Sequence, residues 1–144
     1  MIAVDTNVLL RRLLDDDAEQ AEKARRLFET QESVLVTDIV LAETIWTLTG
    51  KRYRAGKEQL AAVVMGLLEE RNVMFESREA IWSALHDYLD ALPVKTASGV
   101  RTADLADALV VNKAKFTAQE RGEPYRATYT FDQAALALAG TKAP

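Results

Sequence analysis

The stretch IAVDTNVLL, residues 2–10, indicates the fold class of this chain. It begins with a short apolar run at residues 2–4, which suits a buried strand. A helical pattern follows at residues 8–14. Between the two lie three polar residues, Asp5, Thr6 and Asn7. A strand that runs through a polar turn into a helix is the first half of a β-α unit, and three polar residues are more than helix capping requires.

The same alternation continues along the chain. Further strands are predicted at residues 33–36, 72–75 and 126–131. Helices are predicted at residues 18–30, 38–51, 57–71, 78–92, 102–121 and 133–139. The stretch PVKTASG at 93–99 is predicted to be the longest loop, and the tail GTKAP is too short and polar to predict a closing strand. This alternation is typical of α/β folds, so we predict a three-layer α/β/α sandwich with a central parallel sheet of four to five short strands.

Length and composition narrow the class of protein. A chain of 144 residues favours one domain, predicted to span residues 1–144, because domains typically hold about 100–200 residues. The absence of cysteine excludes disulfides, thiolate nucleophiles and zinc–thiolate sites. A net charge of −4 neither indicates nor excludes nucleic-acid binding, which depends on a local basic patch. The start lacks the pattern of a signal peptide and no long apolar run exists, so a cytoplasmic protein without a membrane partner is expected.

Two acids follow predicted strands. Asp5 comes after the first strand, and Asp132 comes after the strand predicted at 126–131. In open parallel sheets, ligands bind beyond the carboxyl ends of the strands. Each residue also precedes a predicted helix, and Asp is a preferred N-cap, so capping alone is an equally good interpretation of either one.

Glu43 lies in the apolar stretch DIVLAETIWTL. Residues three and four positions away share a helix face with it: Ile39, Val40, Trp46 and Thr47. We therefore expect this carboxylate at the rim of the core or buried, where Glu requires a partner. A Glu that extends to solvent from the edge of the helix is the structural alternative. Trp46 and Trp82 are expected to face the core or a partner.

The segment TADLADALVV carries two more acids, Asp104 and Asp107. Their spacing of three places them on one helix face. Asp104 suits the first turn, where the helix dipole favours an acid. Asp107 is expected a full turn into the helix, where capping does not explain it. Two like charges on one face repel unless a cation relieves them, and Arg101 is the structural candidate for that role.

Together these acids predict a site for a hard cation. Mg²⁺ and Mn²⁺ are bound by oxygen ligands, usually a few carboxylates with waters and phosphate. Such ions activate water and stabilise the charge that develops during phosphodiester hydrolysis. A set without His or Cys suits Mg²⁺ or Mn²⁺ better than Zn²⁺.

Four segments in order resemble the PIN-domain nucleases, and most closely the VapC-type toxins: IAVDTNVLLR, DIVLAETIW, DLADALVV and TFDQAA. The resemblance covers essentially the whole chain and implies a single PIN-like nuclease domain, a Mg/Mn-dependent ribonuclease that hydrolyses RNA phosphodiester bonds. It implies that the catalytic metal ligands are Asp5, Glu43, Asp107 and Asp132. It adds Asp104 as a further acid at the metal and, as supporting residues, Thr6, Asn7 and Thr130.

The resemblance also implies partners: an RNA substrate, a cognate antitoxin protein and a second copy in a homodimer. Basic residues that could contact RNA phosphates occur in two sets. The first is Lys51, Arg52, Arg54 and Lys57, and the second is Arg11, Arg12, Lys95 and Arg101. Ordinary solvated surface is the simpler interpretation of any single one.

Two other functions remain open at the level of sequence. One is a non-catalytic α/β interaction domain whose acids only cap helices. The other is a phosphatase-like enzyme that uses the Asp at a strand end. Dehalogenase-like phosphatases require a second Asp two positions after the first, where this chain has Asn7.

Overall fold

The chain divides into two units in the computed structural model, which describes residues 1–144. Unit 1 comprises Met1–Glu76 and unit 2 comprises Ser77–Pro144. Each has its own buried apolar core and its own parallel strands. No helix of either unit has the length and apolar character needed to cross a membrane.

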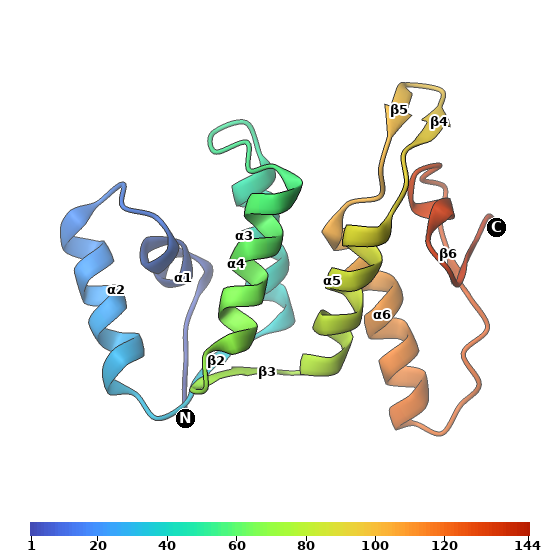
Figure 1. Ribbon diagram of the computed structural model, residues 1–144. Coiled ribbons are helices and arrows are strands. Elements are labelled where there is room, and N and C mark those ends of the chain that lie inside the picture. The colour runs from blue at the N-terminus through green and yellow to red at the C-terminus, as the bar shows by residue number, and fades with distance from the viewer. The chain divides into compact units, whose positions relative to one another are not determined.

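Unit 1 is built on a three-stranded parallel sheet in the order β1-β2-β3. The strands are β1 (Ile2–Ala3), β2 (Val34–Val36) and β3 (Val73–Phe75). The connecting helices are α1 (Thr6–Leu13), α2 (Ala18–Thr30), α3 (Asp38–Thr49) and α4 (Lys57–Glu69). Parallel neighbours require such crossover connections, and α1 packs against both α2 and α3 (Figure 1). Leu9, Val34 and Val36 are fully buried in the resulting core.

Side-chain caps fix where the helices of unit 1 begin. Asp5 accepts a hydrogen bond from the Val8 backbone N–H at 2.8 Å and so starts α1. Asp17 does the same for α2 through the Gln20 N–H at 3.0 Å. Each bond satisfies a backbone donor that the first helical turn leaves without a partner.

Unit 2 pairs two helices with short strands. The helices are α5 (Arg78–Asp90) and α6 (Leu105–Glu120), and a 3-10 turn, η1, covers Ala135–Ala137. The strands are β4 (Val94–Thr96), β5 (Gly99–Arg101), β6 (Thr128–Tyr129) and β7 (Thr141–Lys142). The two helices lie side by side (Figure 1) and bury small residues such as Ala84 and Ala108 between larger ones.

The predicted α/β class and the parallel pairing are confirmed, with the five parallel strands grouped as three in unit 1 and two in unit 2. Three local predictions were wrong. The predicted loop at 93–99 is mostly an antiparallel hairpin of β4 and β5, which turns at Ala97 and Ser98 and enters β5 at Gly99 with φ +107°. The predicted helix at 133–139 is only the 3-10 turn η1.

The third correction concerns the tail, which does form a strand. β7 pairs in parallel with β6, and the N–H groups of Thr128 and Thr130 donate to Gly140 and Lys142 carbonyls at 2.8 and 2.9 Å. Gly140 allows the turn into β7, because its φ is +95° and a Cβ there would lie 3.0 Å from the Lys115 side chain. Hydrogen bonding between backbone groups therefore makes this segment a strand, and the polarity of its side chains does not predict that bonding.

Candidate active site

Asp5 begins α1 two residues after the end of β1. One carboxylate oxygen accepts the Val8 N–H, so the capping interpretation is correct. The residue is nevertheless exposed, and only one of its two oxygens is used by the cap. Its second oxygen can therefore take a cation while the cap remains in place.

Glu43 is exposed, which corrects the expectation that it borders the core. The buried residues of α3 lie on its other face: Leu41, Thr44, Ile45 and Leu48. Ile39 and Trp46, which share the row of Glu43, are 72% and 59% exposed. The helix therefore turns an apolar row outward together with its one mid-helix carboxylate.

A hydroxyl from α1 holds Glu43 in place. Thr6 Oγ1 donates to Glu43 Oε2 at 2.5 Å, across 37 residues of sequence. Because Thr6 directly follows Asp5, this bond brings the two carboxylates to the same end of unit 1. We call Asp5 and Glu43 the Asp5 pair.

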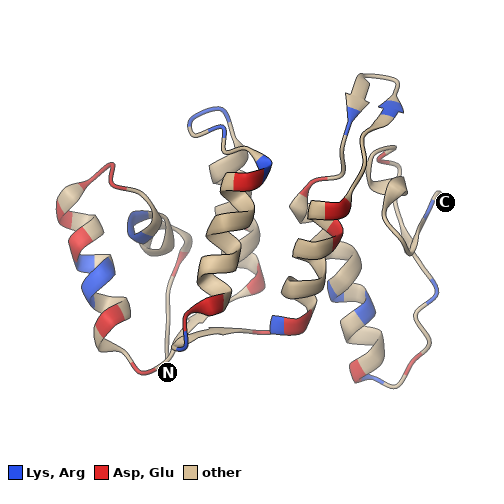
Figure 2. Cartoon of the chain, viewed as in Figure 1, with Lys and Arg blue, Asp and Glu red and all other residues tan.

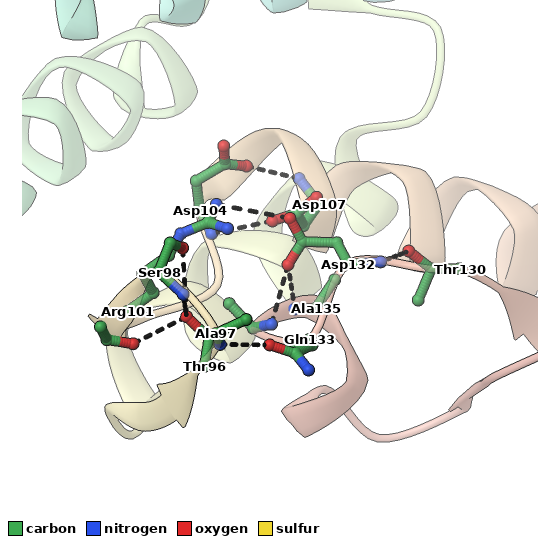
Figure 3. Close-up of polar contacts among 12 residues, drawn as sticks. Thr96, Ala97, Ser98, Arg101, Asp104, Asp107, Thr130, Asp132, Gln133 and Ala135 are labelled. Carbon is green, nitrogen blue, oxygen red and sulfur yellow. Dashed lines mark hydrogen bonds and ion pairs between the residues drawn. The ribbon is translucent and has the colours of Figure 1, made fainter.

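In unit 2, Asp104 and Asp107 cap α6 reciprocally (Figure 3). Asp104 Oδ1 accepts the Asp107 N–H at 2.8 Å, and Asp107 Oδ2 accepts the Asp104 N–H at 3.1 Å. This is a capping box. The prediction that capping does not explain Asp107 was wrong, because α6 starts at Leu105 rather than at 102 and Asp107 falls in its first turn.

Asp132 lies in the same unit, and Figure 3 shows it beside Asp107. Its Oδ1 accepts the N–H groups of Ala134 and Ala135 at 2.8 and 3.0 Å. Its own N–H donates to Thr130 Oγ1 at 3.0 Å. Arg101 Nη2 lies 3.3 Å from Asp132 Oδ2, so this arginine pairs with Asp132. We call Asp104, Asp107 and Asp132 the Asp107 cluster.

The electrostatics of the Asp107 cluster are uneven. Burial first, and then the negative charges of Asp104 and Asp132, raise the pKa of Asp107 to about 6, although the hydrogen bond from the Asp104 backbone N–H acts to lower it. The backbone N–H groups of Ala135 and Ala134, followed by Arg101, lower the pKa of Asp132. The surroundings of the Asp107 carboxylate have too little positive charge to stabilise its ionised form. A bound divalent cation would supply that charge.

The predicted basic residues divide into structural and exposed ones. Arg12 pairs with Glu70 at 2.5 Å and lies over the Phe28 ring, so it is part of the structure of unit 1. Arg11 pairs with Asp16 at 2.5 Å. Figure 2 shows Lys and Arg along the loop that joins α3 to α4. The sequence analysis missed Asp16, whose carboxylate accepts hydrogen bonds from Arg11, Arg52 and Tyr53. Its only signal in the sequence is the run of three aspartates at residues 15–17.

All the candidate ligands are carboxylates, a donor set that suits Mg²⁺ or Mn²⁺. The structure places Asp5, Thr6, Asn7 and Glu43 in unit 1, and Asp104, Asp107, Thr130 and Asp132 in unit 2. The structure has no group of three or more His, Cys, Asp or Glu side chains arranged to hold a metal ion. Each unit supplies oxygen donors of the kind that such a cation binds.

Parallel β-α units with acids at strand ends and helix starts define an α/β protein whose acids lie where such sheets bind ligands. The PIN domain sequence profile matches residues 2–132. The chain therefore belongs to the PIN-domain family, whose members are nucleases that act on RNA.

Among solved structures, the chain is similar to VapC20 of Mycobacterium tuberculosis, described as a toxin that cleaves the sarcin–ricin loop. The two are 19% identical, over 95% of this chain and 94% of that one, with a TM-score of 0.42. A search of curated proteins finds no match. The family assignment rests on the profile match.

Proposed function

We propose that this protein is a metal-dependent endoribonuclease and the toxin of a toxin–antitoxin pair. The metal ligands of this proposal, for Mg²⁺ or Mn²⁺, are Asp5, Glu43, Asp107 and Asp132, with Asp104 as a further acid. The observation that carries the proposal is the grouping of Asp104, Asp107 and Asp132 in unit 2, where burial and then the neighbouring carboxylates raise the pKa of Asp107, in a chain of the PIN-domain family.

Bound to these acids, a divalent cation neutralises charge on the phosphate and promotes attack by water. The chain's own residues orient the ligands. Thr6 holds the Glu43 carboxylate through its hydroxyl, and the Ala134 and Ala135 N–H groups hold Asp132. Caps serve this purpose well, because a carboxylate fixed by backbone bonds loses little freedom when a metal binds.

The partners follow from the family resemblance. An RNA with unpaired nucleotides is the substrate, since loops and ends expose the bases and the phosphates between them. A cognate antitoxin holds the enzyme inactive, the active form is a homodimer, and the cytoplasm, where such RNA is found, is its location.

The test is cleavage of a mixed RNA pool by the purified protein, with and without Mg²⁺ or Mn²⁺. The variant is Asp5→Ala, and its matched control is Asp17→Ala. Both aspartates cap a helix of unit 1 through the N–H three residues later. Both changes therefore cost a cap, about 0.5–2 kcal/mol of stability, but only Asp5→Ala removes a proposed ligand.

Metal-dependent cleavage that Asp17→Ala retains and Asp5→Ala loses would support the proposal. Absence of cleavage, together with no metal binding by calorimetry, would leave the acids as helix caps and favour an interaction domain. A trapped phospho-enzyme would favour the phosphatase-like alternative.

A further inference from the structure

Unit 1 contains a pocket of about 520 Å³ that begins at Glu43. Its lining includes Thr6, Arg11, Glu43, Trp46, Arg52 and Tyr53. Glu43 and Trp46 lie three residues apart on α3 and so share a face. The pocket therefore extends from a proposed metal ligand to an indole ring that is 59% exposed.

Three residues of the pocket lining, Arg11, Arg52 and Tyr53, form hydrogen bonds to Asp16. Its carboxylate accepts from Arg11 at 2.5 Å, from the Tyr53 hydroxyl at 2.9 Å and from Arg52 at 3.3 Å. These bonds, that of Arg11 first, lower the pKa of Asp16, so it stays ionised. They fasten the loop after α3 to the start of α2, so this part of the pocket lining is ordered before any ligand arrives.

The side chains that remain available have a specific chemistry. Arg52 stacks on the Tyr53 ring, with its guanidinium carbon 5.1 Å from the ring centroid. Only one of its nitrogens bonds to Asp16, and its side chain is 73% exposed, so other donors are free. An exposed indole near a fixed guanidinium matches a flat aromatic ring joined to an anion, and a nucleotide has both parts.

We propose that this pocket binds one unpaired nucleotide of the RNA substrate next to the bond that is cleaved. Trp46 stacks on the base, and Arg52 contacts a phosphate. The inference rests on the proposed nuclease function, because Glu43, which lines the pocket, is a proposed metal ligand. A base within a duplex cannot enter, since its faces are covered by its neighbours, so the pocket selects single strands.

The experiment measures binding of a short labelled single-stranded RNA, and of its duplex, to the full-length protein with Mg²⁺. All variants carry Asp107→Asn so that RNA is not cleaved. Trp46→Ala weakens single-strand binding about 5- to 150-fold, the range equivalent to about 1–3 kcal/mol of base stacking. Trp46→Phe retains most of the affinity because it keeps a ring, and the control Trp82→Ala, which removes the other exposed indole, has no effect.

A matched pair of arginines tests the phosphate contact. Arg52 and Arg26 have equally exposed side chains, at 73%, and each pairs with a carboxylate at 3.3 Å. Arg52→Ala reduces the slope of log affinity against log salt by about 0.7, as expected for one lost contact to a single strand. Arg26→Ala leaves the slope unchanged. In a Trp82→Phe background, fluorescence of the remaining Trp46 is quenched by single-stranded RNA and not by duplex.

Unchanged RNA affinity in a Trp46→Ala protein that melts normally would overturn the subsite and assign the exposed indole to a protein partner. An equal loss for duplex and single strand would overturn it as well. Binding that depends on Trp46, together with a wild-type protein that cleaves no RNA, would defeat the nuclease proposal and leave the subsite standing. Cleavage that Trp46→Ala leaves unaffected, measured without Asp107→Asn, would defeat the subsite alone.

Discussion

The Asp5 pair and the Asp107 cluster present carboxylates in different ways. In unit 1, both acids are exposed, and one hydroxyl, that of Thr6, supports Glu43. In unit 2, Asp107 and Asp132 are half-buried, Asp107 exchanges backbone hydrogen bonds with Asp104, and Asp132 pairs with Arg101. The carboxylates of the Asp5 pair are exposed to a ligand, whereas in the Asp107 cluster burial and neighbouring charges disfavour the ionised form of Asp107.

The difference shows that capping and metal binding are not competing interpretations. Asp5, Asp104 and Asp132 all accept backbone N–H groups at the start of a helix or turn. A cap uses one carboxylate oxygen and fixes the direction of the other. The start of the helix therefore positions the carboxylate proposed to bind metal, and the local charge determines how strongly that carboxylate attracts a cation.

The largest expected effect tests whether the two groups serve one reaction. Asp5→Asn and Asp107→Asn should each lower the rate of RNA cleavage by more than about 100-fold, the upper end of what supporting residues cost. Residues that act as a unit are not additive, so the double variant should be no slower than the slower single one. Rates are compared in single-turnover assays, and losses that multiply would separate the two groups.

The next effect compares the two supporting hydroxyls. Thr6→Val removes the donor to the Glu43 carboxylate and should slow cleavage about 10- to 100-fold, while Thr6→Ser restores it. Thr130→Val removes an acceptor of the Asp132 backbone N–H and should cost less, because Ala134 and Ala135 still hold that carboxylate. Steady-state kinetics on one RNA measure the cleavage rates of both variants. A larger loss of rate for Thr130→Val than for Thr6→Val would contradict the prediction.

A smaller effect concerns stability and pH. Because folding raises the pKa of Asp107 to about 6, the folded state binds the proton more tightly, and stability falls as pH rises from about 4 through 6. Asp107→Asn keeps an acceptor for the capping box and should raise the melting temperature of the metal-free protein by a few degrees at pH 7.5. Thermal melts should show this gain disappearing near pH 4.

The control for that melt is Asp17→Asn, which changes a cap in unit 1. At pH 7.5 it should leave the melting temperature nearly unchanged, because Asn is as good an N-cap as Asp. Addition of Mg²⁺ should stabilise the wild-type protein more at pH 7.5 than at pH 5, because the ionised carboxylate binds the cation. A pH-independent gain from Asp107→Asn would contradict the charge argument.

The smallest effect concerns Arg101. Arg101 pairs at 3.3 Å with an oxygen of Asp132, a proposed metal ligand, on the surface of unit 2. Arg101→Gln should therefore tighten Mg²⁺ binding only about 1.5- to 5-fold, which corresponds to the 0.2–1 kcal/mol of an exposed pair. Calorimetric titration measures the change. Weaker binding in the variant would show that Arg101 positions Asp132 for the metal.

Sequence periodicity was sufficient to predict the α/β class, the strands near residues 34 and 73, and most helices, because apolar spacing reports burial directly. The resemblance of four segments, in order along the chain, was enough to predict the family, which the profile match over residues 2–132 confirms. The single domain over residues 1–144 and the metal ligands stay predictions. Strand β7 was missed, because its stability comes from backbone pairing with β6.

By itself, the sequence determined which residue types can bind a cation and in which elements they lie, since local pattern specifies helices and strands. Only the tertiary structure decided their surroundings. It moved the start of α6 to Leu105 and so made Asp107 a capping residue, and it turned Glu43 and Trp46 to the exposed face of α3. The physical reason is that caps, exposure and charge depend on neighbours distant in sequence, such as Thr6 beside Glu43 and Arg101 beside Asp132.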